Sequence, residues 1–224
     1  MLQKLFSIII SLVISISAGA QGTCIINGNI ADSKLADGSK IKAVSLMRAD
    51  ENGQKTEVAV AKVKKGEYTF KNEPVLMYTI AGFGEDNDIE LFIEAGEITV
   101  STPSAAEPCM STVTGTPTND TYTEYKAILN NRENEIATMV KELVNTAGHN
   151  EEAIKKLQAR ESIKTRSQII RFLIDHNTSP MTPFEIEHTL LPILSTAYAD
   201  QIVKSVSTTL HSHPYYHSLR NKVL

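Results

Sequence analysis

Hydrophobic and polar residues follow two different periods along this chain of 224 residues. From Cys24 to about Gly115, apolar residues alternate with polar ones in short runs that Gly, Pro, Asn or Asp residues separate. Such alternation places successive side chains on opposite faces of a β-strand. The pattern predicts strands at residues 24–30, 41–47, 57–63, 67–70, 77–83, 89–93, 98–101 and 110–114.

The clearest local signal in this half of the chain is a β-hairpin. Residues 57–63 alternate, residues 64–66 (Lys-Lys-Gly) form a turn, and residues 67–70 return the chain. A tight turn between two short strands indicates antiparallel pairing. A series of short strands bounded by turn residues is typical of a sandwich. We therefore predict an antiparallel β-sandwich over residues 21–117.

The period changes from two to 3.6 residues in the segment that contains Pro117, which interrupts the sheet. Asn119 or Asp120 can cap a first long helix, because their side chains accept hydrogen bonds from the free amide groups of a helix start. Apolar residues then recur at spacings of three and four until Gly148 ends the helix.

A second long helix follows, with Asn150 as its expected cap and Asn177 near its end. Two long helices joined by a short loop should form an antiparallel hairpin. Shorter helices are predicted at residues 183–191, 200–210 and 214–223. The fold class is therefore α+β, with the N-terminal sandwich followed by a helical region over residues 118–224.

The first twenty residues belong to neither half. Lys4 precedes an apolar run at residues 5–16, and residues 18–20 (Ala-Gly-Ala) form a small-residue cleavage signal. The alternative, a transmembrane anchor, needs roughly 20 apolar residues to cross a hydrocarbon core of about 30 Å, and this run is shorter. We predict a signal peptide over residues 1–20 and an exported chain, periplasmic or associated with the cell envelope.

Charge narrows the class of partner. Cleavage removes Lys4, which leaves 21 of the 22 basic residues against 26 acidic ones. A mildly acidic chain without a cluster of Lys and Arg is not expected to bind nucleic acid, whose phosphates require such clusters. After cleavage no apolar run approaches membrane length, so no transmembrane segment is expected in the mature chain.

The two cysteines, Cys24 and Cys109, can pair in an oxidising compartment. They are candidates for a disulfide, and the alternative is two separate, buried, unreactive thiols. Lipidation of Cys24 is a further alternative, but no large apolar residue immediately precedes it. A catalytic dithiol would need a Cys-x-x-Cys motif, and the chain has none.

The C-terminal segment is rich in histidine. His211, His213 and His217 are candidate metal ligands, because neutral imidazole is a common ligand and residues four apart share a helix face. A zinc site usually needs a third or fourth ligand in suitable positions, and His211 precedes the helix. The preferred interpretation is a helix start capped by His213, with Tyr215 or Tyr216 packed inward. We expect neither a metal nor another cofactor.

Five short motifs follow one another in an order that is typical of a known family. They are Ile-Asn-Gly-Asn-Ile at 26–30, Lys-Gly-Glu-Tyr-Thr-Phe at 65–70, Leu-Phe-Ile-Glu-Ala-Gly-Glu-Ile at 91–98, Val-Thr-Gly-Thr-Pro-Thr-Asn-Asp at 113–120 and Phe-Leu-Ile-Asp-His-Asn-Thr-Ser-Pro at 172–180. In this order they resemble the N-terminal region of envelope thiol-disulfide oxidoreductases of the TlpA/AhpC-TSA-like group. In that group, an uncharacterised β-domain and a helical segment precede a thioredoxin domain.

The resemblance implies an accessory module rather than thiol-disulfide exchange. The chemistry of the family resides in the thioredoxin domain and its Trp-Cys-x-x-Cys motif, whereas this chain has no Trp and ends at Leu224, where that domain would begin. No catalytic residue of the family therefore matches a position here. We expect no enzyme activity, since no other catalytic constellation is recognisable.

Three functions follow from these observations, in order of preference. The first is a non-catalytic accessory or binding module of the bacterial cell envelope, which binds an envelope protein or a small ligand. The second is a redox-linked partner or substrate of an envelope thiol-disulfide oxidoreductase, acting through Cys24 and Cys109. The third is an enzyme of another type that uses the histidines of the C-terminal segment.

Overall fold

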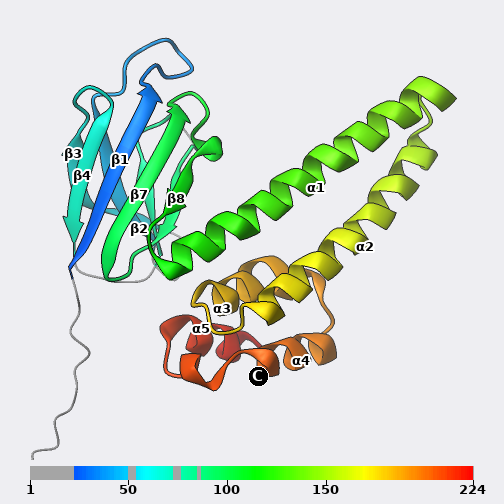
Figure 1. Cartoon of the computed structure of the whole chain (residues 1–224). Coiled ribbons are helices and arrows are strands. Elements are labelled where there is room, and N and C mark those ends of the chain that lie inside the picture. The colour runs from blue at the N-terminus through cyan, green and yellow to red at the C-terminus, as the bar shows by residue number, and fades with distance from the viewer. Residues whose placement is uncertain (1–22, 50–53, 73–76, 85–86, 224) are drawn as a thin grey trace, which may run out of the picture.

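The computed structural model describes residues 23–49, 54–72, 77–84 and 87–223. Figure 1 shows a β-sandwich, a long helical hairpin that leaves its lower end, and a group of short helices beneath that hairpin. The predicted signal peptide at residues 1–20 lies outside the described residues. Within the described ranges, none of the helices combines the length and the apolar character needed to span a membrane.

The sandwich consists of two four-stranded sheets, with strand orders β4-β1-β7-β8 and β3-β2-β5-β6. The strands are β1 (Cys24–Asp32), β2 (Ala43–Ala49), β3 (Lys55–Lys62), β4 (Glu67–Asn72), β5 (Met77–Ala81), β6 (Ile89–Phe92), β7 (Gly96–Ser104) and β8 (Thr112–Thr114). The predicted fold class, an N-terminal β-sandwich followed by helices, is confirmed.

One strand pair differs from the predicted antiparallel arrangement. The strands β1 and β7 run parallel, with Cys24 opposite Gly96 and Asp32 opposite Ser104. Parallel neighbours require a long connection. Here that connection contains the whole second sheet together with β4, so the chain returns to the first sheet in its original direction. The other strand pairs within the two sheets are antiparallel.

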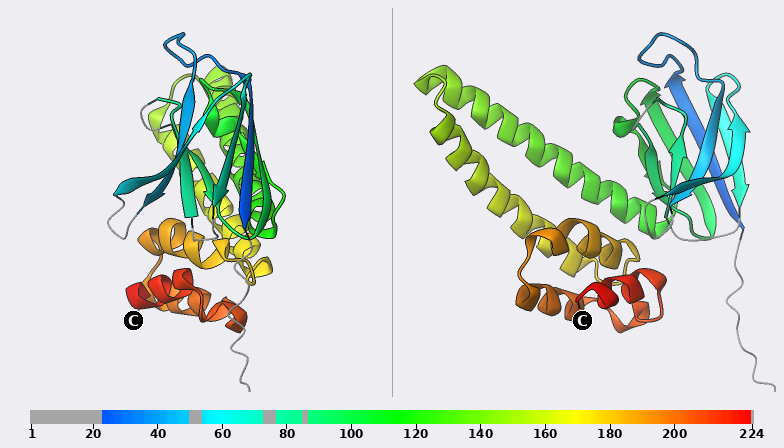
Figure 2. Two further views of the ribbon diagram at one scale, coloured as in Figure 1. Left: turned by 90° about the vertical axis from the view of Figure 1, so that its left-hand side faces the viewer. Right: turned by 180° about the vertical axis from the view of Figure 1, so that it is seen from behind.

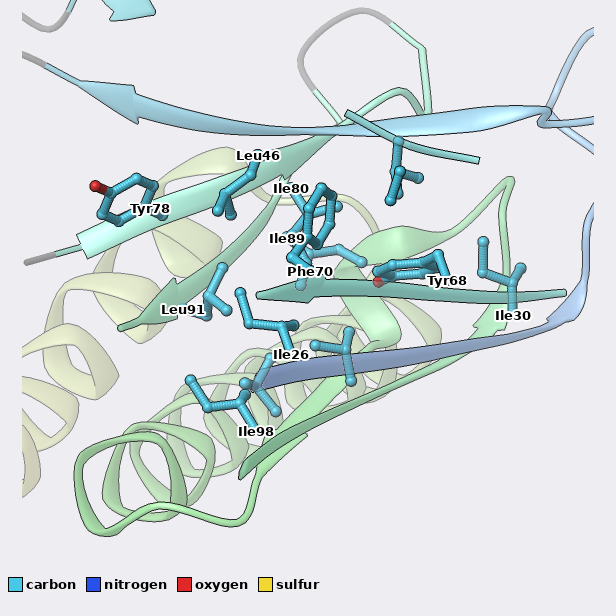
Figure 3. Close-up of a cluster of buried hydrophobic side chains, with 14 of the residues drawn as sticks. Ile26, Ile30, Leu46, Tyr68, Phe70, Tyr78, Ile80, Ile89, Leu91 and Ile98 are labelled. Carbon is cyan, nitrogen blue, oxygen red and sulfur yellow. The ribbon is translucent and has the colours of Figure 1, made fainter. Parts of the chain in front are cut away.

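The core of the sandwich follows from the alternation in the strands. Ile26 from β1 and Ile98 from β7 point inward from one sheet, and Leu46, Ile80 and Leu91 face them from the other (Figure 3). All five side chains are fully buried. A one-residue shift in register would turn this apolar set toward solvent, so burial of the inner faces specifies the pairing of the strands.

The helical region begins with the two predicted long helices and continues with shorter ones. They are α1 (Pro117–Ala147), α2 (Glu151–Asp175), α3 (Met181–Glu185), α4 (Thr196–Ser205) and α5 (Pro214–Val223), with single turns at η1 (Pro108–Met110), η2 (Ile186–Leu190), η3 (Leu191–Ile193) and η4 (Thr208–Leu210). Asn150 caps α2 as predicted, because its Oδ1 accepts the amide of Ala153 at 3.1 Å.

Three predicted elements have different bounds in the structure. The single helix expected at 183–191 is instead α3, the π-helical turn η2 and the 3₁₀ turn η3. Pro192 has no amide hydrogen to donate, which is why a regular helix cannot continue through it. The helix expected at 200–210 begins earlier as α4 and ends at Ser205. The strand expected at 110–114 begins only at Thr112, because η1 occupies the preceding residues.

The hairpin of α1 and α2, which we call the arm, points away from the sandwich (Figures 1 and 2). Its seam is partly polar. Glu161, 1% exposed, accepts from the Arg132 guanidinium at 2.9 Å and from Lys164 Nζ at 2.8 Å. These charge-assisted hydrogen bonds compensate the burial of a carboxylate between the two helices.

Candidate functional site

The end of β6 and the first turn of α1 interlock, and we call this contact the joint. Its residues are Phe92, Glu94, Thr118 and Asn119. The Glu94 carboxylate accepts the amide of Thr118 at 2.8 Å and its hydroxyl at 2.9 Å. A carboxylate in this position satisfies a free amide group and complements the helix dipole. The side-chain cap of α1 therefore comes from Glu94, in the loop between β6 and β7, and not, as expected, from Asn119 or Asp120.

Asn119 has a different role, because it lies inside α1 and is fully buried. Its Oδ1 accepts the amide of Phe92 at 2.9 Å, and its Nδ2 donates to the carbonyl of Phe92 at 2.7 Å. The strand β6 is an edge strand, so these main-chain groups have no strand partner on that side. The carboxamide of Asn119 supplies both hydrogen bonds that a neighbouring strand would have made.

The ring of Phe92 packs in the hydrophobic core of the helices. It makes edge-to-face contacts with Tyr122, Phe184 and Tyr215, at centroid distances of 5.1, 5.5 and 6.0 Å. Phe92 is 3% exposed and belongs to the hydrophobic cluster of the helices, although its backbone is part of the sandwich. The sandwich and the helices therefore share one buried side chain and do not merely touch.

Ionisable side chains gather beside the joint. The Tyr122 hydroxyl donates to Glu90 at 2.6 Å, Lys126 Nζ lies 4.8 Å from the centre of the Tyr122 ring, and Thr189 donates to the Glu185 carboxylate at 2.6 Å. Burial raises the pKa of Glu185 and lowers the pKa of Lys126. Burial disfavours the charged form of each group, which accounts for both directions.

One hydroxyl of this cluster has no hydrogen-bond partner among the residues that the structure describes. The Tyr125 hydroxyl is buried close to Glu185 and Thr189 but makes no hydrogen bond of normal geometry with either. Burial raises the pKa of Tyr125 as well, so the phenol stays protonated. A protonated phenol, a carboxyl group of raised pKa and a lysine can hold or pass a proton, and here Tyr125 and Lys126 come from α1 and Glu185 from α3.

A second feature lies on the outer face of the sheet β4-β1-β7, the face turned toward the viewer in Figure 1. It is a hollow of about 530 Å³. Six outward side chains form its walls: Asn27, Asn29, Glu67, Thr69, Thr99 and Ser101. We call it the polar hollow. Its floor is the main chain of Gly28 and of the two residues paired with it, Tyr68 and Val100.

The predicted cysteine pair is not brought together. Cys24 begins β1 opposite Gly96, whereas Cys109 follows the far end of β7, where Ser104 pairs with Asp32. Strands rise about 3.3 Å per residue, so this separation far exceeds the limit of about 7 Å between the α-carbons of a disulfide. Both thiols are free, with Cys24 buried and Cys109 exposed. The candidate disulfide is therefore wrong for this structure, and burial raises the pKa of Cys24.

The histidines of the C-terminal segment have local partners. His213 Nδ1 accepts the amide of Tyr215 at 3.3 Å, His211 stacks on Tyr216 at a centroid distance of 4.2 Å, and Tyr216 is buried. This matches the interpretation in which His213 caps the last helix. In the part of the chain that the structure describes, no three His, Cys, Asp or Glu side chains converge as metal ligands. His217 therefore belongs to no such group.

Sequence reasoning missed the residues of the joint. Asn119 was expected as a cap, and the signal that separates the two roles is its position after Pro117, which already marks the first helical turn. Phe92 fell within the predicted strand at 89–93, and no contact with the helices was predicted for it. In β6 it breaks the alternation, since Leu91 is also buried, and two consecutive buried residues indicate that both faces of a strand are covered.

Comparison with known proteins gives a match to a family model. Residues 24–122 match a domain of unknown function, DUF4369. The searches of curated proteins and of solved structures gave no significant match. The matched segment spans all eight described strands and ends in the first turns of α1, so it includes Glu94, Asn119 and Tyr122. The segment that resembles DUF4369 therefore contains the sandwich together with both sides of the joint.

Proposed function

We propose that this chain is an exported, non-catalytic accessory module of the bacterial cell envelope, in which the sandwich and the helices act as one unit that binds an envelope protein or a small ligand. The signal-peptide pattern at residues 1–20 supports export. The resemblance of five motifs to the N-terminal region of TlpA-like oxidoreductases supports an accessory role beside thioredoxin-like proteins. The DUF4369 match agrees with a β-domain of unknown role at this position.

The joint is the observation that carries the proposal. Two of the five motifs, at 91–98 and 113–120, meet there, and their polar and aromatic side chains are used to attach α1 to β6. Buried hydrogen bonds and a shared aromatic core fix relative orientation. A module built in this way holds the arm and the short helices at a constant angle to the sandwich, which suits the presentation of a composite binding surface.

Affinity capture with a joint variant tests this function. Mature protein is immobilised and exposed to solubilised envelope proteins, and retained proteins are quantified by mass spectrometry. We expect the wild type to retain a partner, and we expect Phe92→Ala to retain at least tenfold less of it. Leu46→Ala, a truncation of the sandwich core away from the joint, is the matched control and should retain that partner. Equal retention by all three proteins, or none above an unrelated exported protein, would refute a joint-dependent partner.

The redox-linked alternative predicts a different result in the same experiment. Cys109 is an exposed free thiol, so a thiol-dependent partner would be held through it. Capture that disappears with Cys109→Ser, or on addition of reductant, would favour this alternative. Capture that survives both changes would favour a non-covalent binding module.

A further inference from the structure

Each of the six wall side chains of the polar hollow can form hydrogen bonds, and none is aromatic. Its walls come from three adjacent strands, two residues from each. Asn27 and Asn29 stand on β1, between Glu67 and Thr69 on β4 and Thr99 and Ser101 on β7. The register of the sheet therefore sets the spacing of all six groups.

One wall residue organises its neighbours. Asn27 Oδ1 accepts the hydroxyl of Thr69 at 3.1 Å, and Asn27 Nδ2 donates to Glu97 at 2.6 Å. This chain of hydrogen bonds crosses three strands and orients the Asn27 carboxamide. It also occupies the Glu97 carboxylate, which lies beside the hollow rather than in its lining.

The other wall groups are available to a ligand. Among the described residues, the side chains of Asn29, Glu67, Thr99 and Ser101 have no hydrogen-bond partner, and all four are exposed. Together they offer two hydroxyl groups, one carboxamide and one carboxylate around a floor of main chain. Hydroxyls and carboxamides both donate and accept, so they suit a ligand that does the same.

The floor is held in place from the core side. A Cβ on Gly28 would lie 2.0 Å from Cζ of Tyr68, whose ring packs beneath β1 inside the sandwich. No other residue fits at position 28 without displacing that ring. The Tyr68 ring therefore fixes the packing beneath the floor. The volume of the hollow lies in the range of small-molecule sites, about 300–1,000 Å³.

The composition of the lining argues against two classes of ligand, anionic ones and apolar ones. The lining has no Lys, Arg or His, so nothing there would neutralise a phosphate or a carboxylate. All six wall side chains are polar, so a purely apolar ligand would cover their hydrogen-bonding groups without offering them partners, which costs free energy. We propose that the polar hollow binds a neutral, hydroxyl-rich oligosaccharide, whose hydroxyls pair with Asn29, Glu67, Thr99 and Ser101. This names the ligand class of the proposed binding module and rests on that function.

Titration calorimetry on the mature protein tests the inference. The probes are four neutral hexasaccharides (of maltose, cellulose, mannan and N-acetylglucosamine type), with a hexamer of galacturonic acid and one of glucosamine as charged comparators. We expect at least one neutral probe to bind with a millimolar or lower Kd. Asn29→Ala and Ser101→Ala should each weaken it by about 3- to 10-fold, the effect of one hydrogen bond.

A matched variant controls for nonspecific effects. Thr56→Ala changes an exposed threonine of β3, on the other sheet, and should leave the Kd unchanged. Thermal melting shows whether each variant is folded. Absence of binding by all four neutral probes, preference for a charged comparator, or binding that Asn29→Ala and Ser101→Ala leave intact would overturn the inference. Joint-dependent capture of an envelope protein would still support the proposed function in that case, so the two failures are distinguishable.

Discussion

The carboxamide of Asn119 occupies the place of a missing strand beside β6. Two of its three hydrogen bonds go to the main chain of Phe92, 27 residues away in sequence, and the third goes to the Thr116 hydroxyl; all three are buried. Water cannot replace the carboxamide there. An unpaired buried main-chain group costs about 1–3 kcal/mol, so the contribution of this one side chain is large for its size.

Truncation of Asn119 therefore has a predictable effect. Asn119→Ala leaves the amide and the carbonyl of Phe92 without partners, and we expect the free energy of unfolding to fall by about 2–4 kcal/mol. Urea denaturation followed by circular dichroism measures the change. Asn134→Ala, an exposed site on the same helix, should stay within about 0.5 kcal/mol of the wild type. A similar change in the free energy of unfolding for both variants would contradict the role of Asn119 as a substitute for a strand.

The two thiols should differ in reactivity. Cys24 is fully buried with its pKa raised by burial, whereas Cys109 is exposed on η1. A thiol reagent added to the native mature protein should modify Cys109 alone, and Cys24 should react only after denaturation. Peptide mapping by mass spectrometry identifies the modified residue. A Cys24–Cys109 peptide in unreduced protein would show that the structure misplaces this pair.

At the scale of elements, the arm depends on electrostatics more than the sandwich does. The hydrogen bond from Lys164, which has the largest effect, and the one from Arg132 lower the pKa of Glu161 to about 2, from its ordinary value of 4.5. Since the folded pKa is the lower one, the ionised carboxylate stabilises the arm above about pH 4.5. That stabilisation declines as the pH falls from there through about 2.

Removing the carboxylate should remove this pH dependence. Glu161→Gln is expected to lower the melting temperature at pH 6 and to reduce the loss of stability that the wild type shows between pH 5 and 2. Melting curves at intervals of half a pH unit measure it. Glu151→Gln, an exposed acid in the first turn of α2, is the matched variant and should retain the wild-type slope. Parallel slopes for wild type and Glu161→Gln would argue against the ion pairs of the seam.

At the scale of the whole molecule, the sandwich and the helices share a core through Phe92. The ring is surrounded by Tyr122, Phe184 and Tyr215, which come from three different helices. The group of ionisable residues beside it, with Glu90 on β6 and Glu185 on α3, covers the same contact with polar atoms. The two parts are thus joined by both apolar and polar interactions.

Truncation of the Phe92 ring should separate the unfolding of the helices from the unfolding of the sandwich. Phe92→Ala is expected to cost about 3–5 kcal/mol, and the helices should unfold before the sandwich because their core loses its central ring. Hydrogen exchange measured by mass spectrometry reports the two parts separately. Phe70→Ala, which truncates a ring inside the sandwich only, should destabilise the sandwich without selectively exposing the helices. Uniform exchange in Phe92→Ala would contradict the shared core.

The identity of the elements was predictable from the sequence because the period of apolar residues directly reflects side-chain direction in a strand or a helix. Asn150 as a cap and Gly148, at φ +74°, as a helix end are local features of the same kind. Such signals need no knowledge of distant residues. For this reason the α+β class and the helical hairpin could be predicted from the sequence.

Contacts between distant residues were decided by the tertiary structure alone. The parallel pair of β1 and β7, the distance between Cys24 and Cys109, and the pairing of Asn119 with Phe92 all depend on how the second sheet folds back on the first. The six walls of the polar hollow come from three separate strands in the same way. Local periodicity sets which way a side chain points, but only the packed register sets what it meets.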